Sequence, residues 1–528
     1  MNYNVELKKH KIEAMAGYSQ EVSSFRSTGG YVANFPDDDL RVLDAGNESD
    51  NAFGYANEWH YRSYFGRVNY SFDDKYLFQA NIRRDGSSRF SEEHRWGNFP
   101  SVSAAWRLSK EPFFKLPYVN DFKVRASYGE LGMQEFNDYM YYASIASDNN
   151  RDLNYPFGPG KEQAIHIGAR ATAFPSVGLK WEASKQTNIG FDLAMLENKM
   201  TMEFDYYIKN NTDVLYDPPI PLSTGSSSNP TINAANIENK GIEVAFNYRE
   251  MVKPFKYEIN FTAMTNSNKV TRLGRQGTEV IWGGNVYWAF DATTRSSVGM
   301  PIAPFYLYKT DGIFKSQQEV DDYLAAGGAY FNGITPGPGD VKYVDTNGDG
   351  VINGDDKVYF GTGQPGATFG LNINFSYKRF DFNMFLYAVT DKQMINGGKW
   401  LTYWTQHNPG NYHTDLLDAW SEDNPNSDIP RVIQGDARNT QASDLWLEDA
   451  DYLRLRHIEV GYTFPAPLIY GYGIQSMRIF IAGENLLTLT GYTGYDPSID
   501  YGALFSRGVD RSPYPVARQI VTGIQIGL

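Results

Sequence analysis

The strongest candidate for site chemistry in the sequence is the stretch DTNGDGVINGDD at 345–356. Its oxygen-bearing side chains alternate as in the calcium loop D-x-[DN]-x-[DN]-G, with a carboxylate at the twelfth position. Ca²⁺ takes about six to eight oxygen ligands, and Gly350 would make the sharp turn. We expect the protein ligands to be Asp345, Asn347, Asp349, Val351 through its carbonyl, Asn353 through a water, and Asp356.

The alternative interpretation of this loop is a cluster of turn residues without a metal. We favour Ca²⁺ because the spacing is hard to reach by chance. The last ligand is Asp356 where Glu is usual, and no paired helices flank the loop, so the expected affinity is modest. The predicted role is structural and not catalytic. Just upstream, Ser316 and Glu319 predict the start of a short helix that ends near Gly327.

A second group of candidates is aromatic: Trp400, Tyr403, Trp404 and His407 lie in a long polar segment. Exposed rings of this kind could stack on sugar faces or contact a partner protein. A loop folded on its own aromatic core, or an interfacial belt, is the interpretation we favour over direct ligand contact.

Catalytic patterns are missing from the sequence. The seven histidines show no HExxH spacing, and no GxSxG motif places a serine at a strand-to-helix turn. Adjacent acids such as Asp38 and Asp39 are usually solvated loop residues. We therefore predict that the protein is not an enzyme.

The composition favours a large β-protein. Aromatic residues make up 15% of the 528 residues, with 38 Tyr and 32 Phe, and there is no Cys. A net charge of -14 argues against nucleic acid as a partner, because binding its backbone needs clustered Lys and Arg. No apolar run reaches the ~18 residues of a membrane-spanning helix, which leaves membrane strands as the alternative.

Apolar and polar residues alternate with a period of two in many segments. From Phe369 to Tyr377 the odd positions are apolar and the even positions are small or polar, and the pattern resumes at Phe380 after Lys378 and Arg379. Such alternation across a very short link predicts a β-hairpin. Further hairpins are predicted to turn at Asn198 and at 251–254.

The connections between these segments alternate in length. About fifteen segments of roughly ten residues or more are visible, as membrane strands require. Short links near 10, 73, 198, 252, 378 and 467 alternate with long ones at 20–60, 132–176, 212–237, 270–365, 391–451 and 488–514, and the link at 109–120 is intermediate. Short periplasmic turns and long extracellular loops are typical of an antiparallel transmembrane β-barrel. The 270–365 segment would be a long extracellular insert carrying the calcium-like loop.

An odd number of strands that begins and ends on downward strands does not make a complete bacterial barrel, whose strands are even in number. We therefore expect residues 1–528 to be the C-terminal part of a barrel, about 15 of the 22 strands of a plugged transporter. Roughly seven strands and a lumen plug would precede Met1.

The segment NIRRDGSSRFSEEHRWGNFPSVSAAWRLSKEPFF at 81–114 resembles the SusC/RagA family of TonB-dependent transporters. Similarity continues in KVRASYGELG at 123–132, LKWEASKQTNIGFD at 179–192, YLRLRHIEVGYTFP at 452–465 and ENLLTLTGYTGYDPSID at 484–500. The resemblance covers nearly the whole chain.

This resemblance implies the barrel of an importer in the cell outer membrane, embedded in its lipid. Oligosaccharide or peptide would be trapped under a SusD-like surface lipoprotein, and the TonB complex would act through the missing N-terminal plug. The alternative is a surface glycan-binding or structural β-protein without transport activity, which would also be acidic and rich in aromatic residues.

Overall fold

The computed structural model is built mainly of strands. It describes the chain except for residues 40–41, 47, 144, 147–153, 162, 172–173, 219, 221, 225–228, 275–279, 287–291, 404–409, 436–437 and 500–503. Among the described helices, none is both long and apolar enough to cross a membrane.

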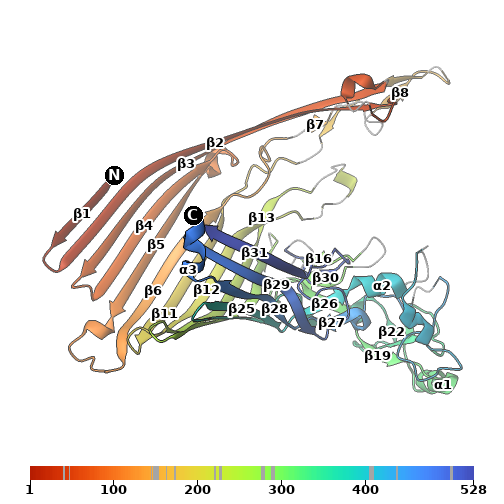
Figure 1. The fold of residues 1–528 in the computed structure, drawn as a ribbon. Coiled ribbons are helices and arrows are strands. Elements are labelled where there is room, and N and C mark those ends of the chain that lie inside the picture. The colour runs from red at the N-terminus through yellow and green to blue at the C-terminus, as the bar shows by residue number, and fades with distance from the viewer. Residues whose placement is uncertain are drawn as a thin grey trace. The chain divides into compact units, whose positions relative to one another are not determined.

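Within the described residues, one antiparallel sheet of 16 strands dominates, and 15 of them follow one another in chain order (Figure 1). β15 (Ser267–Leu273) lies off this path and pairs with β13. This arrangement confirms the all-β prediction and its count of strands. The successive strands are β1 (Asn2–Leu7), β2 (His10–Ala33), β3 (Glu48–Phe72), β4 (Tyr76–Ser87), β5 (Trp96–Arg107), β6 (Val119–Met133), β11 (Glu182–Met195), β12 (Met200–Tyr216), β13 (Ile232–Glu250), β14 (Phe255–Thr265), β24 (Ala367–Tyr377), β25 (Phe380–Thr390), β28 (Tyr452–Thr463), β29 (Ser476–Thr490) and β31 (Gln519–Gly527).

The predicted hairpins form with the expected register. Tyr377 lies opposite Phe380, and Lys378 in the turn between them has a φ of 56°. On the polar face of this sheet, amide side chains bond from strand to strand. The Asn247 Nδ2 donates to the Asn260 Oδ1 at 2.5 Å, and the Asn383 Nδ2 donates to the Asn372 Oδ1 at 2.9 Å. These side-chain hydrogen bonds join β13 to β14 and β24 to β25, and Asn260 lies opposite Asn372 between the two pairs, so we call this row of asparagines the polar ladder.

One predicted connection is wrong in its extent. The sequence indicated a long link at 20–60, but β2 and β3 stay paired to Ala33 and Glu48, which leaves a much shorter loop. The physical reason is that Ser, Thr and Gly in this stretch still complete a backbone ladder, while cross-strand rings support it. Phe25 and Tyr55, for example, have ring centroids 5.5 Å apart.

The long connections after β14, β25 and β29 contain further structure, and we call these three segments (266–366, 391–451 and 491–518) the loop body. Its small sheets are β16 (Ile281–Gly283) with β17 (Thr294–Ser296), β18 (Pro304–Tyr308) and β23 (Lys357–Thr362); β19 (Thr310–Ile313) with β21 (Val341–Tyr343); β20 (Tyr330–Phe331) with β22 (Val351–Ile352); and β27 (Leu447–Asp449) with β26 (Gln393–Asn396) and β30 (Val509–Asp510). Its helices are α1 (Gln317–Ala325) and α2 (Gly397–Tyr403), while α3 (Ala466–Ile469) joins β28 to β29. Ser316 caps the start of α1, and its side chain accepts from the Glu319 amide as predicted.

The chain divides into two compact units. The first comprises 1–106, 125–187 and 209–236, and the second comprises 107–124, 188–208 and 237–528. In the first unit, Phe90, Phe99, Leu179 and Trp181 form a buried cluster. The connection after β6 holds the short strands β7 (Ile145–Ala146), β8 (Tyr155–Phe157), β9 (Ala164–His166) and β10 (Arg170–Ala171).

In the second unit, all three segments of the loop body share one apolar core. Phe305 and Leu307 from the first segment pack with Trp400 and Trp446 from the second and with Val509 from the third. The 270–365 segment thus contributes to this shared core and also holds a second buried cluster made of its own residues, among them Tyr308, Phe331 and Tyr343.

Candidate functional site

The 345–356 loop is held by its own polar side chains. The Asp345 carboxylate accepts from the backbone amides of Gly348 at 2.6 Å and Gly350 at 2.9 Å. Both glycines have a positive φ, 77° and 84°, which an L side chain rarely adopts. These amide hydrogen bonds lower the pKa of the Asp345 carboxyl below its ordinary value.

The other side chains predicted as ligands also accept hydrogen bonds from backbone amides of the loop. Asn347, Asp349 and Asn353 each accept from the amide two residues further on, at 2.8 Å. Asp356 is fully buried, and its carboxylate accepts from the amides of Thr346 and Asn353 at 2.9 Å. In the described part of the chain, no three His, Cys, Asp or Glu side chains are grouped as metal ligands. The loop is thus ordered by hydrogen bonds to its backbone, and Ca²⁺ stays a prediction.

The four predicted aromatic contacts separate into different environments. Trp400 is only 1% exposed and its Nε1 donates to the Thr440 carbonyl at 2.8 Å, so its ring belongs to the loop-body core and is not exposed for ligand. This corrects the contact prediction for Trp400 in favour of the aromatic core. Trp404 and His407 lie outside the described residues.

Tyr403 is half-buried beside Trp446, with ring centroids 5.8 Å apart. Its hydroxyl donates to the Asp415 Oδ2 at 2.7 Å. Burial, together with this carboxylate, raises the pKa of the Tyr403 hydroxyl. The Tyr403 hydroxyl, with a smaller contribution from His413, lowers the pKa of the Asp415 carboxyl. The hydrogen bond of Tyr403 to Asp415 therefore stabilises the second segment of the loop body.

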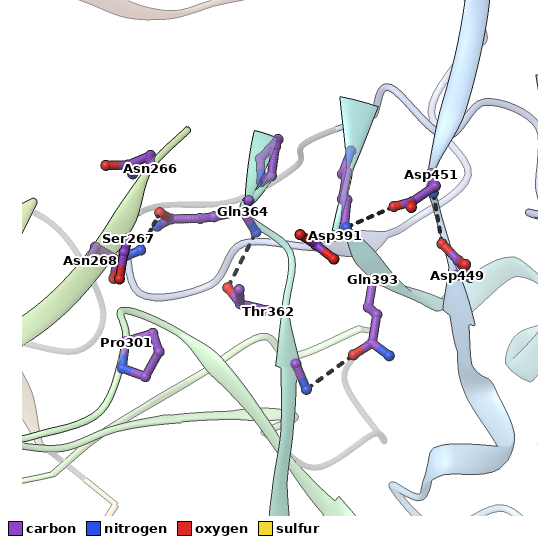
Figure 2. A pocket seen from close by; sticks show the side chains of 14 residues that line it. Asn266, Ser267, Asn268, Pro301, Thr362, Gln364, Asp391, Gln393, Asp449 and Asp451 are labelled. Carbon is purple, nitrogen blue, oxygen red and sulfur yellow. Dashed lines mark hydrogen bonds between the residues drawn. The ribbon is translucent and has the colours of Figure 1, made fainter. Parts of the chain in front are cut away.

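A polar cavity of about 520 Å³, which the sequence did not indicate, lies where the strands of the large sheet meet the loop body. All of its lining residues belong to the loop body, and most of them directly follow β14 and β25 or directly precede β24 and β28 (Figure 2). The residues that line it are Asn266, Ser267, Asn268, Pro301, Gly361, Thr362, Gln364, Pro365, Gly366, Asp391, Lys392, Gln393, Asp449 and Asp451.

Hydrogen bonds fix most of this lining. The Asn268 Nδ2 donates to the Gln364 Oε1 at 2.9 Å, and the Gln393 Oε1 accepts from the Gly361 amide at 3.0 Å (Figure 2). The Asp391 side chain lies against the backbone of Gly366, which is also part of the lining. The cavity is therefore a preformed hollow with amide and carboxylate oxygens on its wall.

The ammonium group of Lys392, the basic residue of the lining, bonds to backbone carbonyls of residues outside the lining. Lys392 is buried, and its Nζ donates to the carbonyls of Pro497 at 2.6 Å and Ile499 at 3.2 Å. The backbone amide of Lys392 donates to the Asp451 Oδ1 at 2.9 Å. The wall of the cavity thus carries the carboxylates of Asp391, Asp449 and Asp451, whose oxygens can accept hydrogen bonds from a ligand.

The meander of long strands, the polar ladder and the folded loops define an outer-membrane β-barrel class. The sequence profile of the family described as "TonB dependent receptor-like, beta-barrel" matches residues 3–486, and the chain belongs to this family. The protein is accordingly an outer-membrane protein of a transporter family without enzymatic activity.

Two curated relatives support this assignment. TonB-dependent receptor P3 of Formosa agariphila is 30% identical over 538 residues, covering 100% of this chain and 51% of that protein. TonB-dependent receptor SusC of Bacteroides thetaiotaomicron is 29% identical over 483 residues, covering 88% of this chain and 43% of that protein. The chain therefore spans about half the length of the curated relatives that it matches.

Among solved structures, the RagAB peptide transporter superposes with a TM-score of 0.83 at 24% identity. The superposition covers 99% of this chain and 54% of that chain. This likeness shows a shared fold. Together with the SusC similarity, it confirms the resemblance to the SusC/RagA type.

Proposed function

We propose that the chain is the barrel part of a TonB-dependent importer of oligosaccharides or peptides that acts with a SusD-like surface lipoprotein. In this proposal the loop body contacts the lipoprotein on the extracellular side. The TonB complex acts through an N-terminal plug, a segment outside these residues.

The observation that carries the proposal is the folded loop body at the long-connection end of a polar-lined sheet. An importer needs a polar path for a hydrophilic cargo and an ordered surface above it. The polar ladder supports the first requirement, and the shared core with its adjoining polar cavity supports the second. The solved RagAB relative is titled a peptide transporter, while the names of P3 and SusC state no cargo.

The rival function is a surface glycan-binding or structural β-protein without transport. Membrane fractionation followed by gel electrophoresis with and without boiling separates barrel from soluble module, since intact barrels change mobility on heating. Uptake of a labelled oligosaccharide or peptide by cells should then require the gene and should stop when the proton gradient is collapsed. Cargo that binds to cells but does not enter would favour the rival.

Partnership with a lipoprotein has its own test. Affinity purification of the tagged receptor from detergent extracts should recover a surface lipoprotein in a stoichiometric amount. Recovery of the receptor alone under several mild detergents would count against the partnership.

We also propose that the 345–356 loop binds Ca²⁺ as a structural clip. Its support is the alternation of oxygen-bearing side chains and the positive φ at Gly350. A chelator should increase protease cleavage between Gly339 and Gly361, and Asp349→Ala should have the same effect without chelator. Unchanged cleavage in both cases would leave the loop as a set of metal-free turns.

A further inference from the structure

Four side chains line up across the outer face of a small sheet in the loop body. In β16 and β17, Trp282 lies directly opposite Arg295. In β18 and β23, Tyr306 lies directly opposite Tyr359, and the pairing of Thr294 with Phe305 joins the two halves. We call Trp282, Arg295, Tyr306 and Tyr359 the aromatic platform.

The members of the aromatic platform contact one another closely. The rings of Trp282 and Tyr306 have centroids 5.6 Å apart, and those of Tyr306 and Tyr359 are 4.9 Å apart. The Arg295 guanidinium lies 4.9 Å from the Tyr306 centroid, 5.5 Å from that of Trp282 and 5.8 Å from that of Tyr359. One of its N–H groups donates to the Tyr359 hydroxyl at 2.9 Å.

The two faces of this small sheet differ in burial. Thr294, Phe305 and Leu307, on the inner face, are 0% exposed and the two apolar ones belong to the loop-body core. On the other face, Trp282 is 50% exposed. Half of the Trp282 side chain is therefore open to solvent, and an indole face can stack on a ligand ring.

The charge on the aromatic platform narrows the class of ligand. Within the described part of the chain, the recorded partners of the Arg295 guanidinium are three rings and one hydroxyl, all of them neutral. The guanidinium is held in one orientation by these rings, and its planar fork matches a carboxylate or a sulfate. An anionic group on a ring-shaped ligand would therefore satisfy both the charge and the exposed indole.

We propose that the aromatic platform binds an anionic saccharide, one that carries a carboxylate or sulfate group. A pyranose ring stacks on Trp282, and the anionic substituent accepts hydrogen bonds from Arg295. The ring centroids follow one another at 5.6 Å from Trp282 to Tyr306 and at 4.9 Å from Tyr306 to Tyr359, which suits a short saccharide segment. This inference rests on the proposed import function, whose cargo it narrows to acidic glycans.

An acidic peptide is the other ligand that Arg295 could attract. Its carboxylates match the guanidinium equally well, but it offers no ring face to cover Trp282. The peptide therefore serves as an outcome of the test and not as the proposed occupant.

The test is direct binding to the purified, detergent-solubilised protein by calorimetry. The probes are a galacturonate tetramer, a sulfated galactose tetramer, a neutral galactose tetramer and tetraglutamate. We expect at least one anionic saccharide to bind roughly tenfold or more tightly than the neutral one, as a charge-assisted hydrogen bond implies. Preference for the carboxylated or for the sulfated tetramer identifies the anionic group.

Variants assign the effect to the platform. Arg295→Gln should abolish the preference for anionic over neutral saccharide, whereas Trp282→Ala should weaken binding of both by about tenfold. Tyr330→Ala, which removes a 41% exposed ring elsewhere on the loop body, should change nothing. If Trp282→Ala increases protease cleavage of the loop body, the variant has lost its fold, and Tyr359→Phe is measured in its place. Tyr359→Phe removes only the hydroxyl that orients Arg295.

Three results would overturn the inference: equal affinity for anionic and neutral saccharides, tetraglutamate binding as tightly as the saccharides, or unchanged affinities in Arg295→Gln. The failure of import is distinguishable from these. Anionic saccharide binding without uptake into cells would refute the proposed function and retain the platform, while uptake of other cargo without this binding would do the opposite.

Discussion

A buried carboxylate in the loop body gives the sharpest prediction about stability. Asp340 is 2% exposed and accepts four hydrogen bonds. Two come from Arg431, from Nε at 2.6 Å and Nη2 at 2.8 Å, and the others come from the Asn439 Nδ2 at 3.1 Å and the Gly337 amide at 2.7 Å. Asp340 thus links the first segment of the loop body to the second. We predict that Asp340→Asn opens this link.

The magnitude follows from the surroundings. Breaking a buried ion pair costs about 3–5 kcal/mol, and each hydrogen bond to a charged group contributes about 1.5–3 kcal/mol. The Arg431 side chain is 34% exposed, so water compensates part of its loss and the lower end applies. A cost of about 3 kcal/mol corresponds to a roughly 150-fold increase in local opening.

Hydrogen exchange at the backbone amides of 337–343 measures this opening in the intact protein. The matched control is Asp311→Asn, which removes an acid from an exposed pair with Lys342 at 2.9 Å, where Asp311 is 69% exposed. The control should change exchange by less than about fivefold, since exposed pairs contribute about 0–1 kcal/mol. Equal exchange rates in the two variants would refute the reasoning.

Three further predictions concern other parts of the chain. Trp400→Ala should cost about 3–5 kcal/mol of loop-body stability by leaving a cavity, measured as faster protease cleavage at 391–403; a rate like that of Tyr330→Ala would contradict this. Arg89→Lys should increase hydrogen exchange of the segment at 134–139 by about tenfold, because Lys cannot hold both Asp138, at 2.7 Å, and the Gln134 carbonyl, at 3.0 Å, while stacking on the Trp59 ring. Unchanged exchange in this segment would refute the prediction. The pKa of the Asp345 carboxyl is lowered in the folded loop, so its ionised form stabilises the loop at pH values above 3.8. Protection of the amides at 348–350 from hydrogen exchange should therefore persist at neutral pH and disappear as the pH falls below 3.8. Protection that survives such acid would show that the Asp345 carboxylate does not order the loop.

The large sheet was predictable because its determinants are local. In β24 and β25, the alternation with a period of two and the two-residue turn fix the register of the two strands without any distant contact. The extent of β2 and β3 was not predictable in the same way. Their outer halves contain Ser, Thr and Gly, whose pairing depends on the backbone of the opposite strand.

The packing of the loop body and the positions of its sites could not be predicted from the sequence, for a different reason. Trp400 was correctly placed in a segment with an aromatic core, but its burial depends on Phe305 and Val509, which belong to other connections. The aromatic platform joins Trp282 to Tyr359 through strands of three to six residues, too short to show a period. The cavity likewise brings together Asn266 and Asp449, which no local pattern relates.

The parallel pairing of β26 with β30 has a consequence for the kinetics of folding. Ile395 pairs with Val509, and Val509 completes the core around Phe305 and Trp400. A chain made and exported from its N-terminus exposes these indole and phenyl surfaces until its final connection arrives. Such high contact order slows folding and favours aggregation of the waiting chain. Periplasmic chaperones should therefore bind 305–446 more strongly in exported chains truncated before 509 than in the full chain.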